Sequence, residues 1–462
     1  MDLVIKNGLL VSSSEIFKAD IAINNGKIAH ISEEINDTAV KEINAEGKYV
    51  FPGFIDAHTH MELPIKDDIY SVDDFYTGTL AAAFGGTTSI IDYIVPYQNQ
   101  SLLSAYKLWR NKAEEKAVID YGFHITISNP SDVILNEVKE LFDYGVTSVK
   151  SFTTYLGKYM MTDDQIYGLL KESNKTKMLV CMHCENGYLL DYFIKQFIVE
   201  GKTEPIYHEL SRPPFLEEEA VGRVIELARF AQSPIFIAHL STAGGLEKIQ
   251  KARDSGFRVA TETCPGYLLL DKSVYELRGF ESAKYICSPP LRPKWHQQKL
   301  WEGLMNGVIE LVATDHCPFN FHKEKQAGKN DFTKIPNGIP SVEDRVPLIF
   351  SEGVIKRKID LKQFVSIMST APAKVFGIYP EKGNLSVGAD ADIVIYDPDY
   401  EWTISAKTHH QNVDYSVFEG KKVVGKPYII ISNGEVIIKN DRFAGKKGRG
   451  KYIHRKASSL FD

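Results

Sequence analysis

Short apolar runs alternate with segments of helical spacing through the middle of the chain. Eight runs rich in β-branched residues recur between residues 49 and 316, and each is followed by a stretch whose apolar residues fall on one helical face. The clearest helical stretches span residues 73–86 and 216–231. The runs are YVFPGFIDA (49–57), TTSIIDYIV (87–95), YGFHITIS (121–128), TSVKSFTTY (147–155), MLVCMHCE (178–185), PIFIAHL (234–240), RVATETC (258–264) and IELVATDH (309–316). Eight alternations predict an α/β fold, a (β/α)8 TIM barrel over residues 53–375.

The two ends of the chain share a different pattern. LVIKNGLLV (3–11), DIAINNGKIAHI (20–31) and YIIISNGEVIIKN (428–440) each have the form strand, Asn-Gly turn, strand. Neither end has enough apolar residues to fold alone, so residues 1–52 and 376–462 are expected to form one small β-sandwich domain, with VGADADIVIYDP (387–398) as a further strand. The final basic stretch, GKKGRGKYIHRK (445–456), is interpreted as a solvated tail.

Composition and charge exclude several classes of protein. The chain has 462 residues, 44% of them hydrophobic, and a net charge of -6 with acids and bases interspersed, which argues against a nucleic-acid partner. No apolar stretch approaches the roughly 20 residues that cross a bilayer, so no membrane association is expected. Five cysteines, spread over a long chain, indicate reduced thiols and a cytoplasmic protein.

Polar residues with metal-binding side chains end several of the apolar runs. His58 and His60 end the first run, His183 ends the fifth, His239 the sixth and Asp315 the eighth. In a TIM barrel the carboxyl ends of all strands open onto one face, where active sites are built. Four histidines and an acid at that face predict a metal site, although a single histidine there would more often be a hydrogen-bonded core residue.

Lys150 lies in the fourth run, where strand alternation places it inside the barrel. A buried ammonium beside metal cations is unfavourable, so the amine is expected to be neutral or chemically altered. As a carbamate it would offer two oxygens that could bridge two divalent ions about 3.5 to 4 Å apart, with a bridging hydroxide as nucleophile. The alternative is a lysine that reaches water from the strand end.

Other polar residues are assigned no chemistry. The CMHC segment at 181–184 has two cysteines at a spacing that suits zinc, but the sequence holds no second pair, so the cysteines are interpreted as packing residues. His124 has no obvious partner and is expected to be structural. His316 should point away from Asp315, and nothing local assigns a role to His208.

These segments together resemble the cyclic amidohydrolases, and within them the dihydropyrimidinases and D-hydantoinases. The resemblance rests on PGFIDAHTHMELP, GGTTSIIDY, VKSFTTY, MHCENG, YHELSRPP, AHLST, SPPLRP, TDHCPF, NGIPSVEDR and GADADIVIYDP, which run almost the whole chain. It implies two Zn²⁺ per chain and a homo-oligomer, a homotetramer. The implied metal ligands are His58, His60, carboxylated Lys150, His183, His239 and Asp315.

The resemblance also implies a reaction. The hydroxide would attack a ring carbonyl of a 5,6-dihydropyrimidine or 5-monosubstituted hydantoin, and Asp315 would move its proton to the leaving nitrogen, giving an N-carbamoyl amino acid. Tyr155 matches the donor to the oxyanion, and main-chain groups of Ser288 and Asn337 match those that hold the ring amides. Apolar substituents are expected to contact the following residues: Met61, Leu63, Phe152 and Tyr155.

Three related functions remain as alternatives. Dihydroorotases carry an arginine where this sequence has Glu62, which is expected to repel a substrate carboxylate, so dihydroorotase is disfavoured. Allantoinase is compatible with the metal motif. A non-catalytic scaffold of the same fold is disfavoured, because all six ligand positions are filled.

Overall fold

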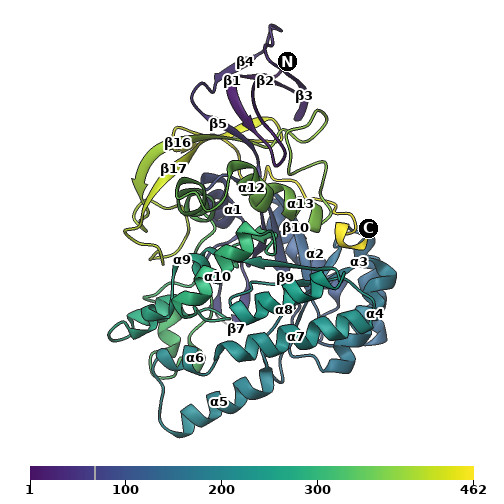
Figure 1. Ribbon diagram of the computed structural model, residues 1–462, viewed down its shortest axis with the longest axis vertical. Helices are drawn as coiled ribbons and strands as arrows, with labels where there is room; N and C mark the ends of the chain where they lie inside the picture. The colour runs from purple at the N-terminus through teal and green to yellow at the C-terminus, as the bar shows by residue number, and fades with distance from the viewer. Residues whose placement is uncertain (67–68) are drawn as a thin grey trace.

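The computed structural model describes residues 1–66 and 69–462 and has two parts, a barrel surrounded by helices and a β sheet at one end (Figure 1). The barrel strands follow one another in chain order around an eight-stranded sheet. They are β6 (Phe54–Thr59), β9 (Thr87–Ile94), β10 (Asp120–Thr126), β11 (Ser148–Phe152), β12 (Leu179–His183), β13 (Ile235–Ile237), β14 (Val259–Thr263) and β15 (Leu311–Val312). A parallel bridge between Thr59 and His316 joins the first strand to the segment after the last.

All eight predicted runs contain a barrel strand, so the predicted TIM barrel is confirmed. The first run holds two strands, because it splits at Gly53 into β5 (Tyr49–Pro52) of the terminal sheet and β6 of the barrel. A side chain at Gly53 would collide with Thr88 and Asp392. The chain therefore passes between the two parts at a position that only glycine fits.

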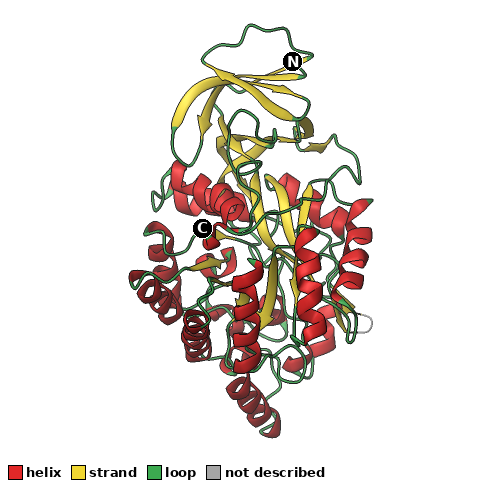
Figure 2. Cartoon of the chain, turned by 90° about the vertical axis from the view of Figure 1, so that its right-hand side faces the viewer, coloured by secondary structure: helices red, strands yellow, loops and turns green. Residues whose placement is uncertain are grey.

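Helices follow the strands and cover the outside of the barrel, as the side view in Figure 2 shows. The predicted helices at 73–86 and 216–231 are confirmed as α1 and α7. In chain order the helices are α1 (Phe75–Phe84), α2 (Leu102–Glu114), α3 (Asp132–Asp143), α4 (Asp163–Thr176), α5 (Gly187–Val199), α6 (Ile206–Leu210), α7 (Pro214–Phe230), α8 (Ala243–Asp254), α9 (Pro265–Leu269), α10 (Lys294–Met305), α11 (Arg345–Ile349), α12 (Leu361–Val365) and α13 (Ala371–Val375). Within the described ranges, no helix is both long and apolar enough to span a lipid bilayer.

Both ends of the chain build one nine-stranded sheet. Its strands are β1 (Leu3–Val11), β2 (Ile16–Asn24), β3 (Lys27–Ser32), β4 (Lys41–Asn44), β5, β16 (Ile393–Thr403), β17 (Lys422–Ser432), β18 (Glu435–Lys439) and β19 (Arg442–Phe443). β5 pairs with both β1 and β16, so it joins the N-terminal strands to the C-terminal ones. Isoleucines of both halves, among them Ile21, Ile393 and Ile431, share one buried core. Both termini therefore contribute strands to one sheet, as expected, and the boundaries of a β domain at residues 52 and 376 stay a prediction.

Two of the three predicted Asn-Gly hairpins are present. Asn25-Gly26 connects β2 to β3 and Asn433-Gly434 connects β17 to β18, each pair with positive φ at both residues, as a two-residue hairpin turn requires. The prediction for Asn7-Gly8 is wrong. Asn7 has φ 59°, but the strand continues through it and its register against β2 shifts by a bulge between Ile5 and Gly8.

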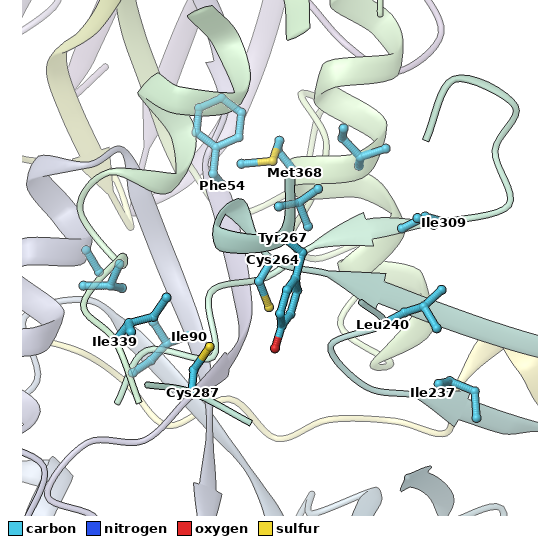
Figure 3. Close-up of a cluster of buried hydrophobic side chains, with 14 of the residues drawn as sticks. Phe54, Ile90, Ile237, Leu240, Cys264, Tyr267, Cys287, Ile309, Ile339 and Met368 are labelled. Atoms are coloured by element: carbon cyan, nitrogen blue, oxygen red, sulfur yellow. The ribbon is translucent and has the colours of Figure 1, made fainter. Parts of the chain in front are cut away.

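The inside of the barrel is filled with apolar side chains at its amino-terminal end. Small and large residues from several strands pack together there, including Ala57, Leu179, Phe236 and Ala313. Outside the strands a much larger core joins barrel and helices, and Figure 3 shows the part of it that includes Cys264 and Cys287. All five cysteines are free and buried, which confirms them as packing residues. This apolar filling leaves the predicted metal-binding residues at the carboxyl end of the barrel.

The C-terminal segment is not a solvated tail, so that interpretation is wrong. The main chain of Lys451 and Ile453 makes hydrogen bonds of 3.0 and 2.7 Å with Tyr121 of β10. Arg455 is 1% exposed and donates to Ser148 Oγ at 2.9 Å. Figure 1 accordingly shows the C-terminus beside the barrel helices, away from the N-terminus. The segment is basic, but its Tyr and Arg side chains bury long apolar surfaces against the barrel.

Candidate metal centre at the carboxyl ends of the barrel strands

A cavity of about 650 Å³ opens at the carboxyl ends of the barrel strands. All six predicted metal ligands line it: His58, His60, Lys150, His183, His239 and Asp315. Four of the eight strand ends therefore deliver one or two ligands each, and Lys150 enters from the middle of β11. The structure brings together every residue that the sequence assigned to the metal site.

One half of the centre is formed by His58, His60 and Asp315, whose ligand atoms lie within 4.8 Å of one another. Asp315 Oδ1 lies 3.2 Å from His58 Nε2 and 3.0 Å from His60 Nε2. The two histidines are alternate residues at the end of β6, so both rings point the same way, with centroids 5.3 Å apart. Two imidazoles and a carboxylate in this arrangement are a donor set for a divalent transition metal.

The other half is formed by Lys150, His183 and His239. Lys150 Nζ lies 3.4 Å from His239 Nε2, and the rings of His183 and His239 have centroids 4.5 Å apart. His183 Nε2 contacts Glu185 Oε2 at 2.7 Å, which leaves the Nδ1 atom of that ring to face a ligand. Lys150 Nζ also lies 5.0 Å from the centroid of the Tyr93 ring, which packs against the rings of His58 and His60, so its nitrogen could connect the two halves.

Burial favours the neutral form of these nitrogens. It lowers the pKa of Lys150, and it lowers the pKa of His239 well below the ordinary value, with the neighbouring Lys150 adding to the effect. The pKa of His183 is also lowered by burial, although Glu185 acts in the opposite direction. A neutral imidazole can bind a metal and a neutral amine can react with CO2, so burial favours both chemistries.

The carboxylate of Asp315 is held ionised. Burial raises its pKa, but His58 and His60 outweigh burial, so the pKa lies well below the usual range. For His58, burial alone would lower the pKa, but the carboxylates of Glu262 and Asp315 outweigh burial and raise it. Asp315 can therefore bind a cation or accept a proton.

Two buried carboxylates orient the histidines, and the sequence analysis missed both. Glu262 of β14 contacts His58 Nδ1 and accepts a hydrogen bond of 3.2 Å from the main-chain N–H of His239. Glu185 contacts His183 and accepts a hydrogen bond of 2.7 Å from Arg212. Carboxylates that hold the second nitrogen of a metal-binding histidine fix its tautomer and orientation. The available signal was an acid inside or directly after an otherwise apolar run.

The backbone is strained where the site residues leave the strands. His239 has φ 38°, Asp315 φ 52° and Tyr155 φ 66°, all in the left-handed region that non-glycine residues rarely adopt. Such conformations cost on the order of 1–3 kcal/mol each and are maintained where the surrounding structure requires them. Three of them lie around one cavity, which supports this cavity as the candidate functional site.

The predicted substrate contacts are placed in two groups. Leu63, Phe152, Tyr155, Ser288 and Asn337 line the cavity. Met61 is fully buried in the main core and packs against Gly78 of α1, and it is not among the described residues that line the cavity. Its predicted contact with a substituent is therefore wrong, because the chain turns after His60 and directs Met61 into the core.

The predicted effect of Glu62 on a substrate carboxylate is also wrong. Glu62 has φ 51° and its carboxylate contacts Lys116 of the segment after α2, so it does not face the cavity. Its main-chain oxygen accepts a hydrogen bond of 3.2 Å from Lys112. No arginine is among the described residues that line the cavity.

The histidines that were set aside are structural. His124 contacts Ser148 Oγ at 2.5 Å and the oxygen of Ala57 at 2.9 Å. His316 is turned away from Asp315 and contacts Asp73 at 2.8 Å. His208 contacts the main-chain oxygen of Cys287 at 2.8 Å, and burial lowers its pKa to about 3. The expectations for His124 and His316 are confirmed.

Several buried polar atoms around the centre have no hydrogen-bond partner within residues 1–66 and 69–462. They are His60 Nδ1, His239 Nδ1, Tyr93 OH, Thr126 Oγ1 and Glu262 Oε2. Thr126 is the register partner of Lys150 on the neighbouring strand, and the Lys150 nitrogen lies 5.0 Å from the centroid of the Tyr93 ring. Buried polar groups are normally paired, so unpaired groups gathered at one place fit a site that holds a further polar group.

Known proteins are similar to this chain in sequence and in fold. The chain is 46% identical to a crystal structure of a D-hydantoinase, with a TM-score of 0.98 and 100% of both chains covered. It is also 46% identical to a dihydropyrimidinase from Brevibacillus agri NCHU1002, over 99% of both chains with a TM-score of 0.98. The D-hydantoinase of Geobacillus stearothermophilus is 48% identical over 98% of this chain and 97% of its own length.

Residues 49–437 match the amidohydrolase family. The chain belongs to this family. Amidohydrolases depend on metal ions, and this amidohydrolase has candidate metal-binding groups of residues, among them His58, His60 and Asp315. Residues 1–49 of the amidohydrolase match the N-terminal domain of the urease alpha-subunit, which places that similarity in the first strands of the terminal sheet.

Proposed function

We propose that this amidohydrolase opens the ring of 5,6-dihydropyrimidines and 5-monosubstituted hydantoins to N-carbamoyl amino acids. The observation that carries the proposal is the convergence of six potential metal ligands at one end of a cavity whose walls also present Tyr155, Ser288 and Asn337. D-hydantoinases and a dihydropyrimidinase are similar to the chain over nearly its full length, which supports the same substrate class.

The donor set fits two zinc ions and a carboxylated Lys150. His58 and His60 would hold one ion, His183 and His239 the other, and the carbamate of Lys150 would connect them, with Asp315 on the first. The unpaired hydroxyls of Thr126 and Tyr93 beside Lys150 support the carbamate, because its oxygens would accept their hydrogen bonds. When bound, such ions polarise a carbonyl and lower the pKa of water toward ~7.

Asp315 is the residue that moves the proton. Its depressed pKa keeps it ionised near neutral pH, so it can accept the proton of the attacking water. The same carboxyl group then delivers that proton to the ring nitrogen as the carbon–nitrogen bond breaks. One side chain thus serves as base in the first step and as acid in the second.

Tyr155 supplies a hydrogen-bond donor to the attacked carbonyl oxygen. Burial raises its pKa to about 12, so the phenol keeps its proton while negative charge develops on that oxygen. Its strained backbone, at φ 66°, turns the side chain into the cavity. Removal of one donor of this kind typically costs about 3–4 kcal/mol in transition-state stabilisation.

The walls of the cavity support a preference for neutral rings with apolar substituents. Leu63, Phe152 and Ile335 provide apolar surface, together with Tyr159. The lysines of the outer wall, Lys158 and Lys334, are exposed, and Lys334 pairs with Asp331 at 3.1 Å. A carboxylate on the ring itself would be buried without a partner, at a cost of several kcal/mol.

A substrate panel with metal analysis tests the proposal. Dihydrouracil, 5-phenylhydantoin, allantoin and dihydroorotate should be compared by kcat/KM with the protein loaded with zinc. We expect the first two to be opened at least about a hundredfold faster than dihydroorotate, and about two ions per chain. A best rate with allantoin would indicate an allantoinase, and a chain that binds no metal and opens no ring would indicate a scaffold.

We further propose that the chain forms a homo-oligomer, a homotetramer, as its resemblance to the D-hydantoinases implies. Helix α5, at the end of the molecule far from the terminal sheet, exposes Tyr188 (59%), Tyr192 (61%) and Val199 (88%). Exposed apolar side chains gathered on one element are typical of an interface. Light scattering should give a mass of four chains, and Tyr192→Glu should lower it, whereas Val40→Glu, on an exposed residue of the β domain, should not.

We infer a cytoplasmic location from the five free thiols. Fractionation of the producing cells, followed by detection of the chain, tests this inference.

A further inference from the structure

Lys325 is a fully buried lysine that takes no part in the metal centre. It lies in the short 3-10 helix η3 (Glu324–Gly328), and none of its side chain is exposed. Its Nζ donates three hydrogen bonds, to the main-chain oxygens of Ile286 at 3.1 Å, Pro336 at 2.7 Å and Gly338 at 2.9 Å. No carboxylate pairs with this amine within the described residues, so all three of its donors serve main-chain oxygens.

The three acceptors belong to two separate segments of the cavity wall. Ile286 is two residues before Ser288, and Pro336 and Gly338 flank Asn337. The segments also contact each other directly, because Gly338 N–H donates to Ile286 O at 2.9 Å and Asn337 Nδ2 donates to Ser288 Oγ at 3.0 Å. Ser288 and Asn337 both line the cavity, whereas Lys325 lies behind them.

We propose that Lys325 is a positioning residue that holds the segments of Ser288 and Asn337 at the separation needed to bind the two amides of a cyclic substrate. The proposal rests on the proposed function, since it gives those two residues a ring to hold. Lys325 does not touch the substrate. It acts through the main chain on either side of the two residues that do.

The chemistry of a lysine amine suits this task. Burial lowers the pKa of Lys325 to about 7, but its nitrogen has three main-chain oxygens within 3.1 Å, and only the ammonium form has three donors for them. In that form it can hold three carbonyls whose segments have no regular secondary structure in common. Hydrogen bonds from a charged donor are stronger than those between neutral groups, and a buried carbonyl that loses its donor is left unsatisfied. Without the amine, Pro336 and Gly338 would each lose a partner, and the two segments would move relative to each other.

Lys325→Met tests the proposal, because methionine fills the same space without the donors. In the zinc-loaded protein KM for dihydrouracil should rise about ten- to hundredfold while kcat changes less than about threefold, since binding of the ring is lost equally in the ground and transition states. Hydrogen exchange should become faster in peptides that cover residues 285–290 and 335–340. Metal content should stay at the wild-type value.

Two variants serve as controls. Lys323→Met removes an exposed lysine two residues away, and neither KM nor exchange should change. Leu304→Ala removes core packing in the outer helix α10, and it should lower thermal stability without raising KM. If Lys325→Met folds poorly, Lys325→Gln keeps two of the donors and should show an intermediate KM.

The outcomes separate this proposal from the proposed function. Unchanged exchange in both segments would overturn the positioning role, whether or not the enzyme opens rings. Faster exchange with an unchanged KM would also overturn it, because the segments would then be held by Lys325 without consequence for the substrate. A wild-type protein that opens no cyclic amide would refute the proposed function, while exchange would still show whether Lys325 holds the two segments.

Discussion

Among the described side chains of the centre, Lys150 alone carries its nitrogen on a flexible aliphatic chain, and this nitrogen lies 3.4 Å from His239 Nε2. Burial lowers its pKa, which favours the neutral form that reacts with CO2. The carbamate has a volume and charge that a carboxylic acid can imitate. Its role can therefore be tested by removing the side chain and supplying the acid separately.

Lys150→Ala should abolish metal binding and activity, because the two halves of the centre lose the group that would connect them. Added acetate or propionate should restore part of both, and the intact wild-type chain should be about 44 Da heavier than its sequence, the mass of the CO2 in the proposed carbamate. Metal analysis, turnover and native mass spectrometry check these results. The control is Lys158→Ala, an exposed lysine that lines the same cavity, which should keep its metal.

Asp315→Asn separates metal binding from proton transfer. The amide can still occupy the position 3.0 Å from His60, but it cannot accept a proton, so turnover should fall by about 10²–10⁴ even in molecules that keep both ions. Turnover per bound metal is the quantity to measure. A rate per metal near that of the wild type would show that another group acts as base.

Which residues line the site was only partly predictable from sequence. The six ligands were found because each follows a recognisable apolar run. Met61 and Glu62 were misassigned because the chain turns sharply after His60, and the positive φ of Glu62 directs its side chain to Lys116. No local sequence signal marks the role of Lys325. Its three acceptors are main-chain oxygens, which every residue has, and they belong to two segments that are far apart in the sequence.

At the scale of elements, the first helix shows how the local sequence fixes the residue at which a helix begins. Asp74 caps α1: its carboxylate accepts hydrogen bonds of 2.8 Å from the N–H groups of Tyr76 and Thr77, and Thr77 Oγ1 accepts one of 3.1 Å from Asp74 N. This capping box satisfies main-chain groups that the helix leaves free. Lys116 adds an ion pair at 3.2 Å.

Asp74→Ala should lower the free energy of unfolding by about 1 kcal/mol, and Asp74→Asn by less, because asparagine also caps a helix and loses only the partly exposed ion pair. Burial raises the pKa of Asp74, but the N–H of Thr77 and Lys116 outweigh it and lower the pKa. The carboxylate therefore stabilises the fold fully above its ordinary pKa, and this stabilisation is lost as the pH falls through the lowered pKa. Urea midpoints at pH 7 and pH 3 check both statements: the two variants should approach the wild type at the lower pH.

The elements themselves were predicted well where one hydrophobic period dominates. The barrel strands are buried on both faces, so they appear as continuous apolar runs. Asn7-Gly8 was misread because its left-handed asparagine suits a bulge as well as a turn, and only the pairing of β1 with β2 on both sides of it decides between them. The solvated tail was misread for a similar reason, since its contacts lie more than 300 residues away in the sequence.

At the scale of the whole molecule, the terminal sheet and the C-terminal segment hold the barrel from one end. Lys382 is buried between Asp120 of β10 and Asp392 beside β16, at 2.7 and 2.6 Å, and so ties barrel to sheet. The segment after β19 then returns to the barrel, where Leu460 and Phe461 pack against the apolar interior. Chain ends that close the amino-terminal end of a barrel support the metal site at its other end without contacting it.

Arg455→Met should lower the free energy of unfolding by about 1–3 kcal/mol, because methionine keeps part of the packing but leaves the hydroxyl of Ser148 and the main-chain oxygen of Phe123 without their donor. Removal of residues 450–462 should cost more, since it also takes away the hydrogen bonds to Tyr121 and the cover of Leu460 and Phe461 over the interior. The control is Lys456→Met, whose side chain is 64% exposed and pairs with a half-exposed Glu381, and it should change stability by less than about 1 kcal/mol. Unfolding midpoints measure these effects, and binding of an apolar dye to the truncated chain measures the exposed interior. Arg455→Met and the truncated chain should keep the wild-type metal content while they are folded. A truncated chain as stable as the wild type would show that the segment adds nothing to the stability of the barrel.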